Sequence, residues 1–224
     1  QDEFDSTCSA KDFASQKTLT RKKRKFAVLK EALEFKGINP GIKHEFTKMV
    51  DSLRSEGHQI SYISLPLLEY LVPCYYILTT AEASSNLSRY DGVKYGYQNN
   101  DGLISTTRSK GFGKEVKRRI LLGTYVLSEG YYEDFYIKAQ KIRRLVQKQT
   151  NKILSKHDYI LLPTTPNLPF KIGDKNISPV QRYYEDVFTV HANLSGHPAL
   201  SFPLGEVEGG FRASAQIIGN FFSE

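Results

Sequence analysis

A strand, helix and strand pattern near the start of the chain most strongly constrains the fold. The short apolar run Phe26–Leu29 follows charged residues and is typical of a buried strand. Pro40 can begin a helix, and apolar residues then recur at helical spacing until Gly57, which favours a helix end. His58–Leu65 is rich in β-branched and aromatic residues and precedes a proline, which predicts a second strand. This succession predicts a βαβ unit with two parallel strands.

The rest of the chain alternates helical and strand patterns. Gly130 either separates two helices or bends one, and the pair Gly209–Gly210 favours a hairpin turn between two final strands. Residues 90–113 predict a loop. We therefore expect an α/β fold in which helices cover a mixed β-sheet. Helices are expected at residues 74–87, 114–131, 132–146 and 187–194, and strands at 158–162, 198–204 and 213–218.

Composition indicates a globular chain. Its 224 residues suit one domain or a large piece of a larger one, and 40% of them are hydrophobic. The longest apolar run is far shorter than the roughly 20 residues of a membrane-spanning helix, so we expect a cytoplasmic protein without membrane contact. Residues 1–20 are polar and should form a loop or a frayed end. Cys8, Cys74 and the five histidines form no metal-ligand pattern, so we predict no metal site.

The charge of the chain is positive, with 31 Lys and Arg against 24 Asp and Glu. Charge runs usually mark solvated faces, and this is the simpler interpretation here. A weak surface for tRNA or an acidic partner is the alternative. The basic groups are Arg21–Lys25, Lys114–Arg119 and Lys138–Lys148.

A series of short strings runs through almost the whole chain. The strings are Asp5–Thr7, Tyr75–Ile77, Ala81–Leu87, Arg89–Val93, Gly111–Ile120, Leu122–Tyr125, Gly130–Tyr132, Lys138–Lys141, Pro163–Pro166, Ala192–Gly196 and Gln216–Gly219. Together and in this order they resemble the amidase signature family, and within it the A subunits of glutamyl-tRNA(Gln) amidotransferases.

The resemblance also exposes a missing part. Catalysis in this family is attributed to a serine nucleophile, a bridging serine and a lysine base within a Gly/Ser-rich signature. The sequence has no such run, and Ser84, Ser85 and Ser214 have no motif that places a base beside them. Residues 1–224 therefore resemble the C-terminal portion of one amidase domain whose catalytic half is absent. We expect no catalytic residue in this chain and no activity from it alone.

The resemblance carries three residues over to glutamine binding: Tyr75, Arg119 and Asp186. Their chemistry suits a free amino acid. A guanidinium can hold the α-carboxylate through two hydrogen bonds, a carboxylate can accept the α-ammonium, and a tyrosine adds a hydroxyl and a ring wall. Without the resemblance, Arg119 would be a surface arginine and Tyr75 a core or rim aromatic, while Asp186 would cap a helix or pair with Arg182.

The resemblance implies a larger assembly around the intact protein. Ammonia released from glutamine would pass to a B subunit, which uses ATP and Mg²⁺ to convert Glu-tRNA(Gln) to Gln-tRNA(Gln), and a small C subunit would bridge the two. The B subunit would make most contacts with tRNA, and this chain would bind no cofactor. One alternative is a fragment of a stand-alone amidase. An amidase that hydrolyses hydrophobic amides would not need a site that recognises both charged ends of an amino acid. The other alternative is a non-catalytic basic module that binds RNA or protein.

Two departures from the family pattern stand out. His191 occupies a position where relatives more often have proline, and the segment 98–108 is shorter than in relatives. A histidine restores the backbone N–H that proline lacks, so the local helix start can differ. A shortened surface loop is usually tolerated and leaves the expected fold unchanged.

Overall fold

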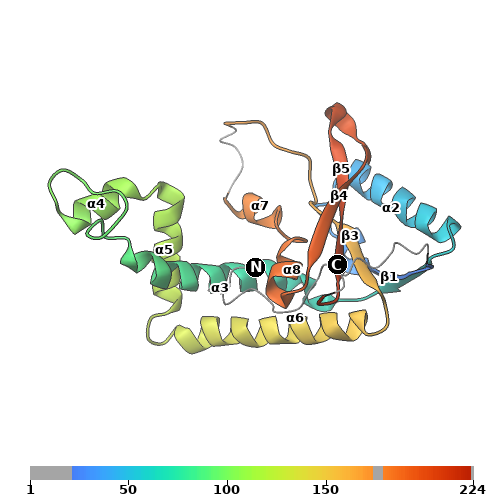
Figure 1. Cartoon of the computed structure of the whole chain (residues 1–224), viewed down its shortest axis with the longest axis horizontal. Helices are drawn as coiled ribbons and strands as arrows, with labels where there is room; N and C mark the ends of the chain where they lie inside the picture. The colour runs from blue at the N-terminus through green and yellow to red at the C-terminus, as the bar shows by residue number, and fades with distance from the viewer. Residues whose placement is uncertain (1–21, 174–178, 223–224) are drawn as a thin grey trace.

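The centre of the fold is a five-stranded mixed sheet with the strand order β2-β1-β3-β5-β4 (Figure 1). The computed structural model describes residues 22–173 and 179–222, so the expectation for residues 1–20 lies outside the described part. Strands β2, β1 and β3 are parallel, whereas β5 is antiparallel to β3 and β4. The predicted mixed sheet is confirmed. The strands are β1 (Lys25–Leu29), β2 (Gln59–Ile63), β3 (Tyr159–Pro163), β4 (Ala199–Glu206) and β5 (Arg212–Gly219).

Helices cover both faces of this sheet. No helix in the described part of the chain combines the length and apolarity that crossing a membrane requires. The α-helices are α1 (Lys30–Leu33), α2 (Pro40–Ser55), α3 (Leu71–Asn86), α4 (Ile104–Gly111), α5 (Lys114–Val126), α6 (Lys138–Leu154), α7 (Pro179–Tyr184) and α8 (Val190–Ser195). Three 3₁₀ helices, η1 (Pro66–Tyr70), η2 (Leu87–Arg89) and η4 (Glu208–Gly210), and a π-helical segment, η3 (Tyr132–Ile137), complete the described elements.

Strand β1 shows how the sequence distributes the core between the two faces. Successive side chains of a strand point to opposite faces. Phe26 and Val28 accordingly pack with Phe46 of α2, whereas Ala27 and Leu29 join the larger core beneath α3, α6 and α8. The predicted βαβ unit is confirmed, because β1 and β2 pair in parallel and α2 connects them.

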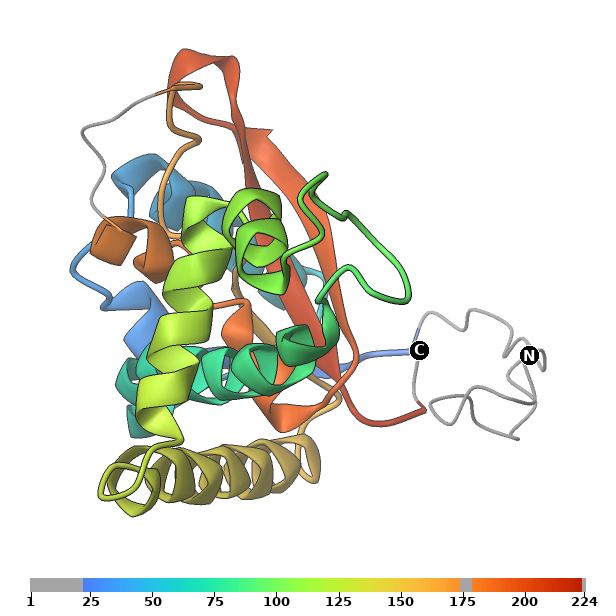
Figure 2. The ribbon, with the colours of Figure 1, turned by 90° about the vertical axis from the view of Figure 1, so that its left-hand side faces the viewer.

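Helices α3 and α5 cross in close contact outside the sheet, as Figure 2 shows. Gly123 of α5 makes this approach possible. A Cβ atom at this position would lie 2.0 Å from the carbonyl oxygen of Thr80 and 2.6 Å from the Cβ of Ser84, both in α3. The hydroxyls of Ser84 and Thr124 share a hydrogen bond of 3.0 Å beside this contact. Only glycine permits this spacing of the two backbones.

Helix α4 corrects the loop that the sequence predicts for residues 90–113. Its sequence is polar and has no apolar stripe, so periodicity gives no signal for it. Contacts with distant residues hold it instead. The Thr107 hydroxyl accepts a hydrogen bond from the backbone N–H of Asn99, and Arg108 donates to the carbonyl oxygens of Leu87 and Tyr90.

Other boundaries differ modestly from the expected ones. Helix α3 begins at Leu71 and includes Pro73, which the first helical turn tolerates because its N–H groups have no partner within the helix. Gly130, with φ 84°, separates α5 from η3 and α6, so two helical segments form and not a single bent one. The predicted hairpin is confirmed, and Gly209 and Gly210 both have a φ of 76° at its turn.

His191 is completely buried between α8 and α6. The Thr150 hydroxyl donates to the carbonyl oxygen of Val146, so its oxygen accepts a hydrogen bond from Nε2 of His191, 2.9 Å away. The ring proton therefore lies on Nε2, and Nδ1 has no partner among the described residues. Burial, and to a smaller extent the nearby His197, lower the pKa of His191 to about 4.

We expect Gly123→Ala to lower the free energy of unfolding by about 1–3 kcal/mol, the usual cost of forcing extra volume into a packed interior. Urea unfolding of the chain measures the effect. Leu121→Ala, at an exposed position of the same helix, is the control and should change stability little. Equal stability of Gly123→Ala and the unmodified chain would contradict a tight crossing of α3 and α5.

We expect stability to fall as the pH is lowered from about 6.5 to about 4. In this window the unfolded chain protonates His191 and the folded chain does not, so each pH unit costs up to about 1.4 kcal/mol. Urea unfolding across this range should show a shallower pH dependence for His191→Gln. The exposed His44 provides the control variant, His44→Gln, whose slope should match that of the unmodified chain.

Candidate functional site

Two helices and one turn carry the three predicted binding residues. Tyr75 lies in α3 and Arg119 in α5, while Asp186 lies in the turn between α7 and α8. The crossing of α3 and α5 brings the first two elements together, and the turn that carries Asp186 comes much later in the sequence. Arg119 and Asp186 therefore come near one another only through tertiary structure.

Tyr76, the neighbour of Tyr75, connects the arginine and the aspartate. Its hydroxyl donates a hydrogen bond of 2.9 Å to Oδ2 of Asp186. The guanidinium carbon of Arg119 lies 5.4 Å from the centroid of the same ring, a cation–π distance. One tyrosine thus contacts both charged groups, which places the Arg119 and Asp186 side chains on the same side of the molecule.

Tyr75 has a more peripheral place. Its ring packs edge-on against Tyr76, with centroids 5.4 Å apart, and it borders the larger core. Its hydroxyl makes no hydrogen bond to any described residue. The sequence assigns the binding role to Tyr75 and gives no signal that Tyr76 is the connecting residue. Its position four residues before the buried Thr80 places both on the side of α3 that faces α5, but this face is recognisable only once the crossing is known.

The structure also differs from the interpretations of Arg119 as a surface arginine and of Asp186 as a helix cap. The Arg119 side chain is 36% exposed, and its Nε donates to Oε1 of Glu115 at 3.2 Å. It is therefore a partly covered arginine over an aromatic ring. The carboxylate of Asp186 accepts from Tyr76, and α8 has no side-chain cap at its N-terminus, so the expectation of a helix cap is wrong.

The electrostatics of the cluster keep its tyrosine neutral and its arginine charged. Burial and the hydrogen bond to Asp186 raise the pKa of Tyr76 well above its ordinary value. Burial alone would lower the pKa of Arg119, but the hydrogen bond to Glu115 and the neighbouring tyrosines outweigh it and raise this pKa. The cluster thus combines the guanidinium of Arg119 with the acidic side chains of Glu115 and Asp186, and a second guanidinium, that of Arg118, binds Glu115.

A hollow of about 450 Å³ lies at the carboxyl ends of β1 and β2, next to the turn that carries Asp186. Glu31 borders the hollow, and its carboxylate accepts hydrogen bonds from the Ser64 hydroxyl and from the backbone N–H of Leu65. These hydrogen bonds connect the segment after β1 to the segment after β2. Crevices at this edge of an α/β sheet commonly bind ligands. The lining residues are Glu31, Phe35, Pro66, Leu68, Glu69, Tyr184 and Val187.

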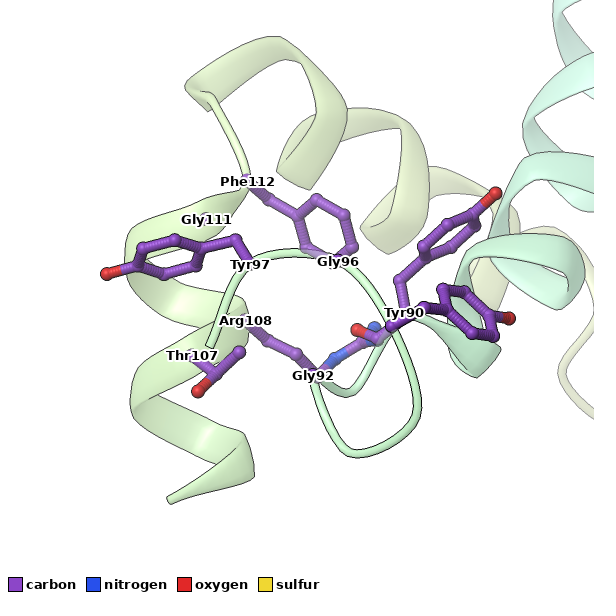
Figure 3. Close-up of a pocket in the computed structure, with 9 residues that line it drawn as sticks. Tyr90, Gly92, Gly96, Tyr97, Thr107, Arg108, Gly111 and Phe112 are labelled. Carbon is purple, nitrogen blue, oxygen red and sulfur yellow. The ribbon is translucent and has the colours of Figure 1, made fainter. Parts of the chain in front are cut away.

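A smaller cavity of about 100 Å³ lies in the lobe formed by α4 and the loop before it (Figure 3). Arg108 lines the cavity and donates hydrogen bonds to the carbonyl oxygens of Leu87 and Tyr90. Its guanidinium carbon lies 5.0 Å from the ring centroid of Phe112. The arginine thus organises the loop. Tyr76, Arg119 and Asp186 line neither of these two cavities.

Nucleophilic and metal chemistry find no support in the described residues. The Ser84 hydroxyl shares its hydrogen bond with Thr124, and no lysine or histidine of the described part hydrogen-bonds to the side chains of Ser84, Ser85 or Ser214. Nor does this part of the chain contain a group of three or more His, Cys, Asp or Glu side chains placed to hold a metal ion. The cluster itself offers a guanidinium donor and a carboxylate acceptor on the same tyrosine.

Comparison with known proteins agrees with this architecture. The sequence profile of the Amidase family matches residues 1–224, so the chain belongs to the amidase family. It is 44% identical over 230 residues to the A subunit of the glutamyl-tRNA(Gln) amidotransferase of Pelagibacter ubique, covering 100% of this chain and 47% of that protein. The corresponding A subunit of Ectopseudomonas mendocina is 47% identical over 193 residues, covering 84% of this chain and 40% of that protein.

Solved structures give the same result. The A subunit of the glutamyl-tRNA(Gln) amidotransferase of Thermotoga maritima matches with a TM-score of 0.67 and 37% identity, covering 89% of this chain and 39% of that one. A 6-aminohexanoate cyclic dimer hydrolase, 16% identical, has the same fold with a TM-score of 0.72. The chain thus has the α/β fold of amidase-signature enzymes and spans less than half the length of these relatives.

We expect Tyr76→Phe to lower the free energy of unfolding by about 1 kcal/mol, because the substitution leaves the Asp186 carboxylate without its donor. Tyr75→Phe is the matched control, since it removes a hydroxyl that bonds to no described residue, and it should leave stability within about 0.5 kcal/mol. Urea unfolding of both variants measures the difference. If the two variants were equally stable, Tyr76 would not connect α3 to the Asp186 turn.

Proposed function

We propose that residues 1–224 are the C-terminal portion of an amidase domain in the A subunit of a glutamyl-tRNA(Gln) amidotransferase. Two such A subunits are 44% and 47% identical to the chain over 100% and 84% of its length, which supports the proposal. In this interpretation the chain supplies the glutamine-binding side of the amidase pocket. The proximity of an arginine and an aspartate that share the Tyr76 ring and hydroxyl is the observation that carries it.

Each group of the cluster has a task toward free glutamine. Arg119 holds the α-carboxylate, for which a guanidinium offers paired N–H donors. Asp186 accepts the α-ammonium, and its Oδ1, which bonds to no described residue, is the oxygen available for this contact. Tyr75 contributes a ring wall and a hydroxyl. These contacts fix the two charged ends of the amino acid and thereby direct its side-chain amide toward the catalytic groups.

The chemistry on that amide belongs to the catalytic half of the domain. A serine, a bridging serine and a lysine of that half form and hydrolyse the acyl-enzyme and release ammonia. Residues 1–224 contribute no catalytic group and hydrolyse no glutamine alone. The ammonia passes to a B subunit, which uses ATP and Mg²⁺ to convert Glu-tRNA(Gln) to Gln-tRNA(Gln) in the cytoplasm. The B subunit makes most of the contacts with tRNA, and a C subunit joins the A and B subunits. No cofactor is assigned to this chain.

We expect Arg119→Ala, in the protein that joins these residues to the catalytic half, to raise the KM for glutamine about 10- to 100-fold. Loss of a charge-assisted pair of hydrogen bonds costs about 1.5–3 kcal/mol, which corresponds to this range. Glutaminase kinetics measure it, and Arg144→Ala, an exposed arginine of α6, is the control. An unchanged KM and kcat would refute the role. Preference for a hydrophobic amide over glutamine would instead indicate an amidase of another specificity.

A further inference from the structure

Within the described part of the chain, the guanidinium of Arg119 donates a hydrogen bond through only one of its nitrogens. Nε donates to Oε1 of Glu115, one helical turn earlier in α5. Among the described residues, the two terminal nitrogens of Arg119 have no hydrogen-bond partner. The contact with Glu115 therefore leaves available the pair of N–H groups that can bind a carboxylate with two parallel hydrogen bonds.

Glu115 is itself held in place by two other side chains. Its Oε2 accepts a hydrogen bond of 2.8 Å from Arg118, and its Oε1 accepts a longer one, 3.4 Å, from the hydroxyl of Tyr183. Tyr183 belongs to α7, and its ring packs on that of Tyr76 with centroids 4.2 Å apart. Glu115 thus connects the arginine to α7 as well as to its own helix.

These contacts form a closed circuit around the cluster. It runs from the Tyr76 ring to Tyr183, from the Tyr183 hydroxyl to Glu115, from Glu115 to Arg119, and from Arg119 back to the Tyr76 ring. Asp186 is attached to it through the Tyr76 hydroxyl. The Glu115 side chain is 46% exposed, so its ion pair adds little to stability. Its contribution is geometric, because an arginine side chain without such a partner samples many rotamers.

We propose that Glu115 is a positioning residue that orients Arg119 for the α-carboxylate of the substrate. By binding Nε, it sets the plane of the guanidinium over Tyr76 and directs the two terminal nitrogens away from its own carboxylate. The inference rests on the proposed function, because it concerns the same glutamine site. It assigns Glu115 no contact with the substrate, only control over how Arg119 presents its donors.

Three substitutions of Glu115, made in the protein that joins these residues to the catalytic half, distinguish the effect of its hydrogen bond to Arg119 from the effect of its negative charge. Glu115→Gln keeps an oxygen that can accept from Nε but removes the charge, and should leave the KM for glutamine within about threefold. Glu115→Ala removes the acceptor and should raise this KM about tenfold with little change in kcat, which is about the effect of losing one hydrogen bond. Glu115→Asp keeps the charge on a shorter side chain that no longer reaches Nε, and should resemble Glu115→Ala.

A second substrate distinguishes positioning from general damage. 4-Aminobutanamide is glutamine without its α-carboxylate, so the orientation of Arg119 should not affect its hydrolysis. We expect kcat/KM for this amide to be equal in Glu115→Ala and the unmodified protein. Glu82→Ala, which removes an exposed carboxylate from α3, is the matched control and should leave both substrates unaffected. Circular dichroism verifies folding, and Glu115→Asp provides the test if Glu115→Ala does not fold.

The outcomes separate this inference from the proposed function. Absence of glutaminase activity in the unmodified protein would refute the proposed function itself. An active protein in which Glu115→Ala leaves the KM for glutamine unchanged would refute only the positioning role. A lower KM in Glu115→Ala would also overturn it, because Glu115 would then compete with the substrate for Arg119. Equal losses for glutamine and 4-aminobutanamide would indicate a purely structural residue.

Discussion

The close contact between α3 and α5 is the constraint on which the candidate site depends. Gly123 lets the backbone of α5 approach the Thr80 carbonyl so closely that any side chain at this position would overlap it. Tyr76 lies one turn before Thr80, and Arg119 lies one turn before Gly123. The contact therefore determines whether the arginine can lie over the tyrosine ring. The packing of two backbones sets the geometry of the charged groups.

The β-sheet fixes the positions of α3 and of the turn that carries Asp186. Its larger core holds α3, α6 and α8 against β1 and β3, and the turn before α8 carries Asp186 to the hydroxyl of Tyr76. The cluster contains two carboxylates and one guanidinium within a partly covered surface. Tyr76 contacts both charged groups, Asp186 through its hydroxyl and Arg119 through the face of its ring.

Most of the fold could be predicted from the sequence, and the exceptions have a common cause. The strands, α2 and the final hairpin follow from apolar periodicity and turn residues, which are local signals. Helix α4 lacks such a signal, because Arg108 and Thr107 hold it through partners elsewhere in the chain. The resemblance predicts Arg119 and Asp186, whereas the role of Tyr76 could not be predicted because its contacts depend on helix packing. The contact of Glu115 with Arg119 lies within α5 and follows from their spacing of four residues, but its contact with Tyr183 depends on the fold.

The sequence by itself determined the family of the chain, the order of its elements and the absence of the Gly/Ser-rich signature from these residues. These properties follow from local patterns and from strings of adjacent residues. Only the tertiary structure decided that Tyr76 and not Tyr75 contacts both charged groups, and that Tyr183 of α7 reaches Glu115 of α5. The reason is physical: neighbours in a helix point in different directions, and which of them meets another helix depends on how the two helices cross.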